Sequence, residues 1–189
     1  MKMYISPHGR LAAIPSGIIN CLTLPTEIDG VFPTEVESSA FYKMHIDKLI
    51  IPGQYSRIYS RAFRRCYIKE LVILPGPAKL AFDYQSFSYN DIEKVVFPDR
   101  VWYIGKSAFA LNTNLKEIET SGAEIIFTKA FEGCMNVSKL SISSEKCLIK
   151  SCAFSKEIEN MDISFDSFVE IEDGAFEGAP IERTESTTT

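Results

Sequence analysis

The sequence lacks a long apolar run and a surplus of basic residues. Its longest apolar stretches, such as the one from Leu71 to Leu74, are a few residues long, whereas a membrane-spanning helix needs about 20. Its 20 Lys and Arg stand against 25 Asp and Glu, which gives a formal net charge of −5 and leaves no general basic surface to neutralise phosphates. We therefore expect no membrane insertion and no nucleic-acid partner.

Cysteine is scarce and irregularly spaced, and no export signal is visible. The five positions are Cys21, Cys66, Cys134, Cys147 and Cys152. This number is too small and too irregular for a disulfide framework, and an odd count leaves at least one thiol unpaired. Near the N-terminus, Pro7 and Arg10 fall where a signal peptide would need its apolar core. We expect a cytoplasmic protein on the chain as given, or a cell-surface or secreted one if a leader has been removed.

Motifs for catalysis and cofactor binding are also missing. There is no Gly-x-Gly-x-x-Gly or Walker loop, and His8 and His45 are the only histidines, without any Cys-x-x-Cys pair. Ser143 and Lys146 match Ser-x-x-Lys, but the companion motifs of acyl transferases that use this pair are absent. The sequence predicts no catalytic residues, no cofactor and no metal site.

What the sequence does contain is a repeat of about 22 residues. A Phe, preceded by Ala in six copies and by Ser in one, recurs at spacings of 22, 24, 22, 22, 23 and 22 residues. These positions are Phe41, Phe63, Phe87, Phe109, Phe131, Phe154 and Phe176. Five residues before them stand the hydrophobic residues Val36, Ile58, Phe82, Ile104, Ile126, Ile149 and Ile171. A period of 20 to 29 residues is typical of a leucine-rich type of solenoid.

Each repeat begins with a hydrophobic pattern that predicts a short strand. Its three apolar positions place alternate side chains on one face. The runs are Ile19/Leu22/Leu24, Ile46/Leu49/Ile51, Ile68/Leu71/Ile73, Ile92/Val95/Phe97, Leu115/Ile118/Thr120, Val137/Leu140/Ile142 and Ile158/Met161/Ile163. Pro25, Pro52 and Pro98 follow three of the runs directly and end those strands, because proline cannot donate to a ladder. We predict a strand, a turn and a short helical turn carrying Ala-Phe in each repeat.

These offsets resemble those of the BspA-like leucine-rich repeats. The best-matching copies are IEKVVFPDRVWYIGKSAFALNTNL, which starts at Ile92, and IIFTKAFEGCMNVSKL, which starts at Ile125. The resemblance implies an α/β fold: a right-handed, horseshoe-like solenoid of about seven repeats, with one parallel concave sheet and short helical turns. Two departures, between Leu24 and Phe41 and over Lys79 to Tyr84, are expected to loop out.

Sequence on either side of the repeats predicts the domain boundaries. Residues 1–18 contain two apolar segments about a Pro-His-Gly turn, which predicts a cap hairpin before repeats over 19–181. Residues 182–189 form a polar tail. Because Ile181 begins what would be another copy, the last rung looks poorly capped. Either the tail folds over it, or another molecule covers it and the chain self-associates through this end, or the natural protein continues.

Charged residues at one strand position alternate in sign from repeat to repeat. This column reads Cys21, Lys48, Glu70, Lys94, Glu117, Lys139 and Asn160. The column before it, Asp47, Lys69, Glu93 and Lys116, alternates too. Adjacent parallel strands would bring opposite charges side by side, so we predict a ladder of exposed ion pairs.

The next outward column along the strands is apolar in its middle and predicts a partner surface. It reads Thr23, Ile50, Val72, Val96, Glu119, Ser141 and Asp162. Leu74 extends the apolar part, and contiguous exposed apolar surface marks interaction sites. The aromatic residues Tyr59, Tyr84, Trp102 and Tyr103 are expected to form a rim around it. In the alternative interpretation, Ile50, Val72 and Val96 only strengthen the sheet, because β-branched residues favour strands.

Three classes of function follow in order of support. The leading hypothesis is a non-enzymatic recognition or scaffold module that binds an unidentified protein. The second, implied by the resemblance, is a repeat segment of a bacterial cell-surface or secreted adhesin. An enzyme comes third, because a regular solenoid rarely makes a deep pocket with convergent titratable groups.

Overall fold

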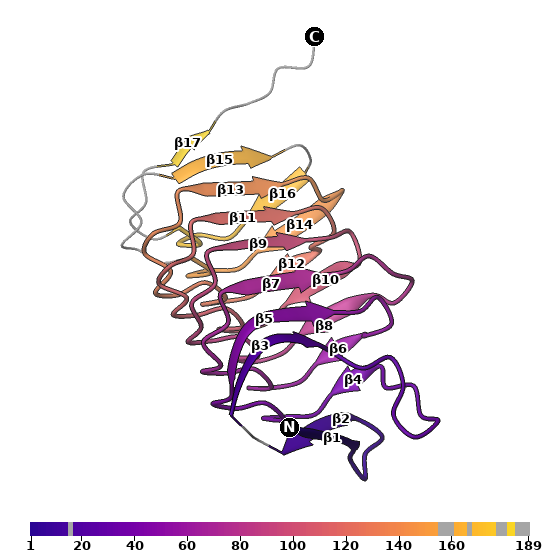
Figure 1. Ribbon diagram of the computed structural model, residues 1–189. Helices are drawn as coiled ribbons and strands as arrows, with labels where there is room; N and C mark the ends of the chain where they lie inside the picture. Colours follow the sequence, from indigo (N-terminus) through magenta and orange to yellow (C-terminus); the bar gives the residue numbers. More distant parts are fainter. Residues whose placement is uncertain (15–16, 155–160, 166–167, 177–180, 184–189) are drawn as a thin grey trace.

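The molecule is a β-solenoid that winds through stacked rungs from its N-terminal end to its C-terminal end (Figure 1). The computed structural model describes residues 1–14, 17–154, 161–165, 168–176 and 181–183, the last of these by their backbone alone. Each complete rung contributes one strand to each of two sides and a turn segment to the third. None of the described segments is a helix that could cross a membrane.

One side of the solenoid is a continuous nine-stranded sheet. Its strands, in spatial order, are β1 (Lys2–Ile5), β2 (Leu11–Ile14), β4 (Glu35–Val36), β6 (Arg57–Ile58), β8 (Leu80–Phe82), β10 (Val101–Ile104), β12 (Ile125–Ile126), β14 (Lys146–Ile149) and β16 (Phe168–Ile171). β1 and β2 form an antiparallel hairpin, and β2 pairs in parallel with β4. The hairpin therefore covers the first rung, at the place where the sequence predicts a cap.

The second side carries two shorter sheets of parallel strands. The first contains β3 (Ile18–Thr23), β5 (His45–Ile51) and β7 (Glu70–Ile73). The second contains β9 (Lys94–Phe97), β11 (Glu117–Thr120), β13 (Lys139–Ile142), β15 (Met161–Phe165) and β17 (Ile181–Arg183). The expectation of one strand per repeat is therefore wrong, because the hydrophobic residue five positions before each Phe lies in, or ends, a second strand. β17 includes the first two residues of the predicted tail, and 184–189 lie outside the described residues.

The predicted helical turns are wrong, and with them the α/β class. No helix occurs among the described residues. The residue two positions before each Phe of the repeat has a positive φ, which interrupts a right-handed helix. These residues are Ser39 (59°), Arg61 (60°), Gln85 (55°), Ser107 (54°), Lys129 (62°), Cys152 (55°) and Gly174 (75°). The Phe N–H instead donates to the next rung, as from Phe109 N to Ala130 O at 2.9 Å.

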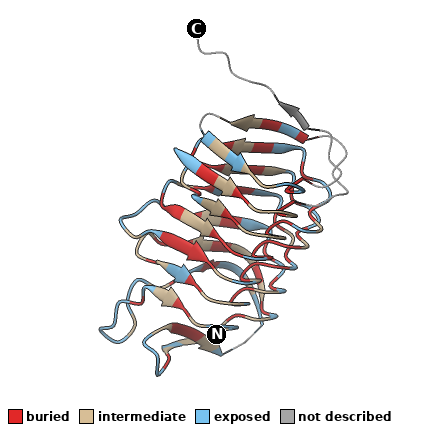
Figure 2. Cartoon of the chain, turned by 180° about the vertical axis from the view of Figure 1, so that it is seen from behind, coloured by how far each residue is buried: buried red, intermediate tan, exposed pale blue. Residues whose placement is uncertain are grey.

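The seven Phe side chains form a continuous column inside the solenoid. Consecutive rings stack with centroids 4.7 to 5.7 Å apart, and every ring is at most 5% exposed. Figure 2 colours the chain by burial and shows that buried residues recur from rung to rung along the stack. The Phe column thus confirms the repeat frame that the sequence predicts.

Beside this column, the residue three positions after the Phe joins neighbouring turns in several of the central rungs. Asn90 Nδ2 donates to the carbonyls of Phe63 and Phe87, both at 2.9 Å. Asn112 makes the same pair of bonds one rung further on, to Phe87 and Phe109. The amide side chain therefore satisfies buried carbonyls from two rungs at once, which a side chain without donors could not do.

The two predicted irregularities have different outcomes. Residues 25–34 form the expected loop, which Gln54 holds by donating to the carbonyls of Thr26 and Pro33. The expected loop over Lys79 to Tyr84 is wrong, because Leu80–Phe82 is strand β8 and both Leu80 and Phe82 are buried. The two extra residues of this repeat are instead accommodated in the segment 74–79 before the strand.

Arg100 bridges this irregular repeat from inside. Its side chain donates to the carbonyls of Leu74 (2.7 Å), Ala78 (3.1 Å), Tyr55 (2.8 Å) and Pro52 (3.2 Å), and the residue is 5% exposed. At the same level β7 and β9 belong to separate sheets. Arg100 therefore connects carbonyls of the extra segment and the preceding rung where the strand ladder is interrupted.

The register of β15, the strand of the seventh run, differs from the predicted one by two residues. Leu140 lies beside Ile163, and Ile142 lies beside Phe165, so pairing Met161 with Leu140 was wrong. Ile163 precedes Phe176 by 13 residues, whereas Leu140 precedes Phe154 by 14, so the distance from the strand to the Phe varies by one residue between these rungs. Ile158 and Asn160, which the prediction also used, lie outside the described residues.

Candidate functional site

The predicted apolar surface lies on the outer face of β5, β7 and β9. Ile50 lies in register with Val72, and both are half-buried. Val96, on β9, is 47% exposed, and Leu74, which follows β7, is 39% exposed. We call these four residues the apolar strip. The strip crosses the interruption between the two short sheets, because Val72 and Val96 stand on either side of it.

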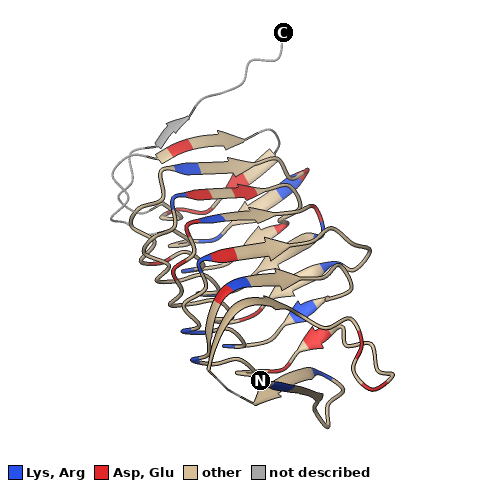
Figure 3. Cartoon of the chain, viewed as in Figure 1, with Lys and Arg blue, Asp and Glu red and all other residues tan. Residues whose placement is uncertain are grey.

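Ion pairs lie beside the apolar strip, as the charge alternation predicts. Lys48 Nζ lies 2.6 Å from Glu70 Oε1, and Lys69 Nζ lies 3.2 Å from Asp47 Oδ1. Figure 3 shows the signs alternating from strand to strand on this side. The ladder places charge next to an apolar centre, which is the composition of a protein-binding surface with a polar rim.

On the C-terminal side of the strip, Lys94 holds two carboxylates. Its Nζ lies 2.8 Å from Glu117 Oε2 and 2.6 Å from Glu119 Oε1. Hydrogen bonding to Lys94 lowers the pKa of Glu117. Further along, Lys139 lies beside Asp162, so the alternation of sign continues through a different residue from the predicted Asn160.

The predicted aromatic rim is wrong, because the four aromatic residues belong to the other sheet. Trp102 and Tyr103 are part of β10, Tyr59 follows β6 directly, and Tyr84 comes two residues after β8. All three strands belong to the nine-stranded sheet. The aromatics thus accompany the second strand of each rung, which the sequence analysis did not anticipate, and they cannot surround the apolar strip.

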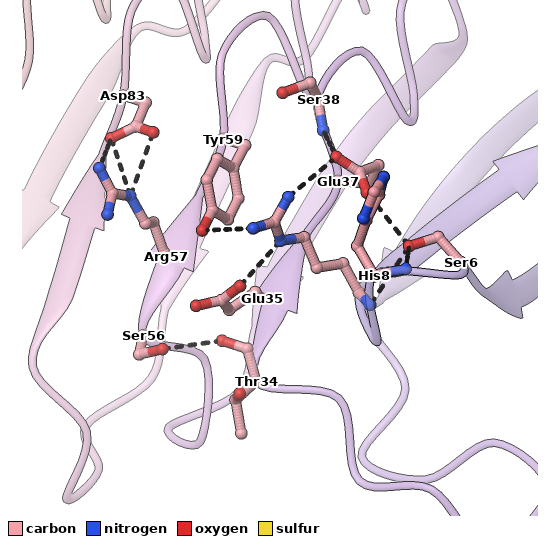
Figure 4. A network of polar contacts seen from close by, with 11 residues as sticks. Ser6, His8, Thr34, Glu35, Glu37, Ser38, Ser56, Arg57, Tyr59 and Asp83 are labelled. Carbon is pink, nitrogen blue, oxygen red and sulfur yellow. Dashed lines mark hydrogen bonds and ion pairs between the residues drawn. The ribbon is translucent and has the colours of Figure 1, made fainter.

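Around Tyr59, the nine-stranded sheet carries a polar network (Figure 4). Arg10 Nε donates to Glu35 at 3.0 Å, and Nη2 of the same guanidinium donates to the Tyr59 hydroxyl at 2.9 Å. Beyond Tyr59, Arg57 pairs with Asp83 at 3.1 Å. Nothing in the sequence repeat marks Arg10, since it precedes the first copy, and only the position of the hairpin brings it to these strands.

The buried cysteines have structural roles. Cys66 and Cys134 stand three residues after the Phe of their repeats, at the position that Asn90 and Asn112 occupy in other rungs. Their thiols donate to the carbonyls of Phe41 and Phe109. Burial raises the pKa of each thiol to about 12, so neither ionises near neutral pH. Cys21 is exposed and Cys152 is half-buried, which confirms that these two are the more accessible thiols.

A hollow of about 640 Å³ lies over the turns that join the two sides of the solenoid in its C-terminal half. Asp99, Glu124, Glu145 and Glu170 contribute to its lining. Glu124 pairs with Lys79 at 2.7 Å. In the part of the chain that the structure describes, no group of three or more His, Cys, Asp or Glu residues is placed to hold a metal ion.

These features define a class of protein. Rungs of 22 to 24 residues stack through parallel strands, a buried Phe column and Asn or Cys at several of the turns, which is the architecture of a leucine-rich repeat solenoid. The chain belongs to the BspA-type leucine-rich repeat family. Six copies of that repeat match it, over residues 34–156 and 81–188.

Solved structures share this fold. The pneumococcal vaccine antigen PcpA is 22% identical with a TM-score of 0.62, over 84% of this chain and 42% of that one. A leucine-rich repeat protein of T. pallidum is 15% identical with a TM-score of 0.61, over 93% and 86%. A leucine-rich repeat protein from Eubacterium ventriosum is 18% identical with a TM-score of 0.59, over 82% and 49%. This chain thus spans less than half the length of PcpA. No curated protein matches the sequence.

Proposed function

We propose that this chain is a non-catalytic recognition module that binds another protein through the apolar strip on β5, β7 and β9. The observation that supports the proposal is the exposure of Val96 and Leu74 in the middle of a face that is otherwise lined by ion pairs. Membership of a repeat family that presents regular surfaces agrees with it. The partner would be a protein with a complementary apolar ridge between charged edges.

The competing explanation is that these residues only favour the strand conformation. β-Branched side chains stabilise sheets whether or not anything covers them. This explanation accounts for Ile50, Val72 and Val96 equally well. It does not account for Leu74, which lies beyond the end of β7, is not β-branched and has an exposed side chain.

The test compares the wild type with a Val72→Asp/Val96→Asp double variant. Pull-down from the source cells and sedimentation at several concentrations would measure partner binding and self-association. Ser141→Asp is the matched control, because Ser141 is an outward residue on β13, beyond the apolar strip. Circular dichroism and thermal melts would first establish that all variants fold.

We expect the double variant to lose a partner or an oligomer that the Ser141→Asp variant keeps. If the double variant keeps every partner and every oligomer, the residues of the apolar strip only stabilise the sheet and the proposal fails. An oligomer that persists in the double variant would direct attention to the predicted contact through the C-terminal end. Fractionation of the source cells would test the predicted location independently.

A further inference from the structure

The outer face of the nine-stranded sheet contains a hollow. This sheet forms the other side of the solenoid from β5, β7 and β9, which carry the apolar strip (Figure 1). Outward residues of β4, β6, β8 and β10 lie side by side in register here, in the order Glu35, Arg57, Ala81 and Tyr103. Ala81 offers only a methyl group between two large neighbours. The resulting hollow measures about 360 Å³, within the range of about 300–1,000 Å³ that small-molecule sites occupy.

An irregularity in β10 brings a second aromatic ring to this hollow. The pairing of β10 with β8 shifts between Val101 and Tyr103, so Trp102 is an extra residue without a partner in β8. Both Trp102 and Tyr103 line the hollow, with ring centroids 5.4 Å apart. Such bulges re-aim side chains and occur next to functional sites. Because successive side chains of a regular strand point to opposite faces, the adjacent residues Trp102 and Tyr103 can line the same hollow only through this shift.

The polar groups at the hollow are charged but balanced. Arg57 is paired with Asp83, and Glu35 is paired with Arg10. Neither an anion nor a cation therefore gains a net electrostatic attraction. The guanidinium has five N–H donors and a carboxylate can accept several hydrogen bonds, so both keep capacity for a neutral ligand. The hydroxyl of Ser56 adds a further polar group to the lining.

We propose that this hollow binds a pyranose ring of a neutral glycan. A sugar ring has an apolar C–H face and a rim of hydroxyl groups, which matches a site with aromatic faces and a few fixed donors and acceptors. Trp102 and Tyr103 contact the C–H face, while Arg57 and Glu35 hydrogen-bond the hydroxyls. A purely apolar ligand would leave these charged groups desolvated without compensation. A charged one would compete with the existing ion pairs.

The sequence supplies its own reporter, because Trp102 is the only tryptophan in the chain. Fluorescence excited selectively at this indole therefore reports on the hollow and on nothing else. The wild-type protein would be titrated with the methyl glycosides of glucose, galactose, mannose and N-acetylglucosamine. We expect a saturable change in emission with at least one of them.

Two variants and a control locate the binding. Ala81→Leu fills the hollow and should weaken binding at least about tenfold, or about 1.4 kcal/mol. Arg57→Gln removes donors at an exposed position and should also weaken it, without touching the core. Ser141→Leu makes a comparable change on the opposite sheet and should leave the titration unchanged.

Several outcomes would overturn the proposal. One is the absence of a saturable response to any of the four glycosides. A second is a response that survives both Ala81→Leu and Arg57→Gln. A third is a response confined to a charged sugar such as glucuronate, which would contradict the inference from balanced charges. The Val72→Asp/Val96→Asp variant should bind the glycoside as the wild type does, so failure here and failure of the protein-binding proposal can be told apart.

Discussion

Phe109 lies at the centre of the aromatic column. Its ring stacks between those of Phe87 and Phe131, at 5.2 and 5.7 Å, and meets the edges of Phe82 and Phe97. Because the side chain is fully buried, Phe109→Ala removes apolar burial and leaves a cavity. We expect a loss of about 3–5 kcal/mol in the free energy of unfolding, measured by denaturant melts.

The matched control is a Phe outside the column. Phe168 on β16 is 89% exposed, so Phe168→Ala should change the free energy of unfolding by no more than about 0.5 kcal/mol. A loss below about 1 kcal/mol for Phe109→Ala would contradict the buried column, since no well-packed aromatic ring is removed so cheaply.

At the scale of the strands, the ladder around Lys94 predicts a dependence on pH. Its ion pair lowers the pKa of Glu117 below the ordinary 4.5. The unfolded chain therefore binds the proton more readily, so this pair stabilises the fold above the ordinary pKa and the stabilisation disappears as the pH falls below it. Glu117→Gln should lose less stability than the wild type between neutral and acidic pH. Urea melts across this pH range would measure the difference.

Salt provides the check on this interpretation. The carboxylate is exposed, so high ionic strength should screen the attraction and reduce the difference between wild type and variant. Identical losses of stability on acidification in low salt would mean that Lys94 and Glu117 do not interact in solution.

The repeat pattern predicted the stacked rungs well, but it predicted the backbone conformation of the turn segments poorly. The Phe spacing predicts the number of rungs and their order, but it does not determine the register of the last run, where Ile163 rather than Met161 lies beside Leu140. The positive φ two residues before each Phe could not be predicted, because residues such as Arg61 and Lys129 carry no glycine-like signature. The sequence therefore predicted helical turns in the Ala-Phe segments, whereas these segments form successive turns whose N–H groups donate to the next rung.

Of the two candidate sites, one could be predicted from the sequence and the other could not. The apolar strip follows from strand alternation, because Val72 and Val96 occupy the outward phase of two regular strands. The hollow does not, because it depends on which strands of the nine-stranded sheet become neighbours and on the shift in β10 that leaves Trp102 without a partner in β8. Only the stacking of β8 on β10 places Ala81 next to Tyr103, and no spacing within one repeat contains that information.

For the whole molecule, the interruption between β7 and β9 predicts uneven stability. The nine-stranded sheet continues past this level, but the opposite ladder does not. Hydrogen exchange under mildly denaturing conditions should therefore show β3, β5 and β7 opening at a different free energy from β9, β11 and β13. Arg100→Ala should widen this difference, because it removes the donors that bridge the interruption.

The control for this experiment is Arg61→Ala, an exposed arginine that lies over the Tyr84 ring and makes no bridge between the two ladders. It should leave the exchange pattern unchanged. Exchange of both groups of strands at one common free energy, in wild type and in Arg100→Ala, would show that the solenoid opens as a single cooperative unit.

We expect the interruption between β7 and β9 to act also as a joint, at which the solenoid can bend. Because β7 and β9 do not pair, changing the angle between the sheet of β3, β5 and β7 and the sheet that begins with β9 should cost less energy than bending between paired strands. The continuous nine-stranded sheet opposite should act as the hinge. Val72 and Val96 stand on opposite sides of this joint. A partner seated on both would fix the angle between the sections, and its affinity would depend on how often the free protein already adopts that angle.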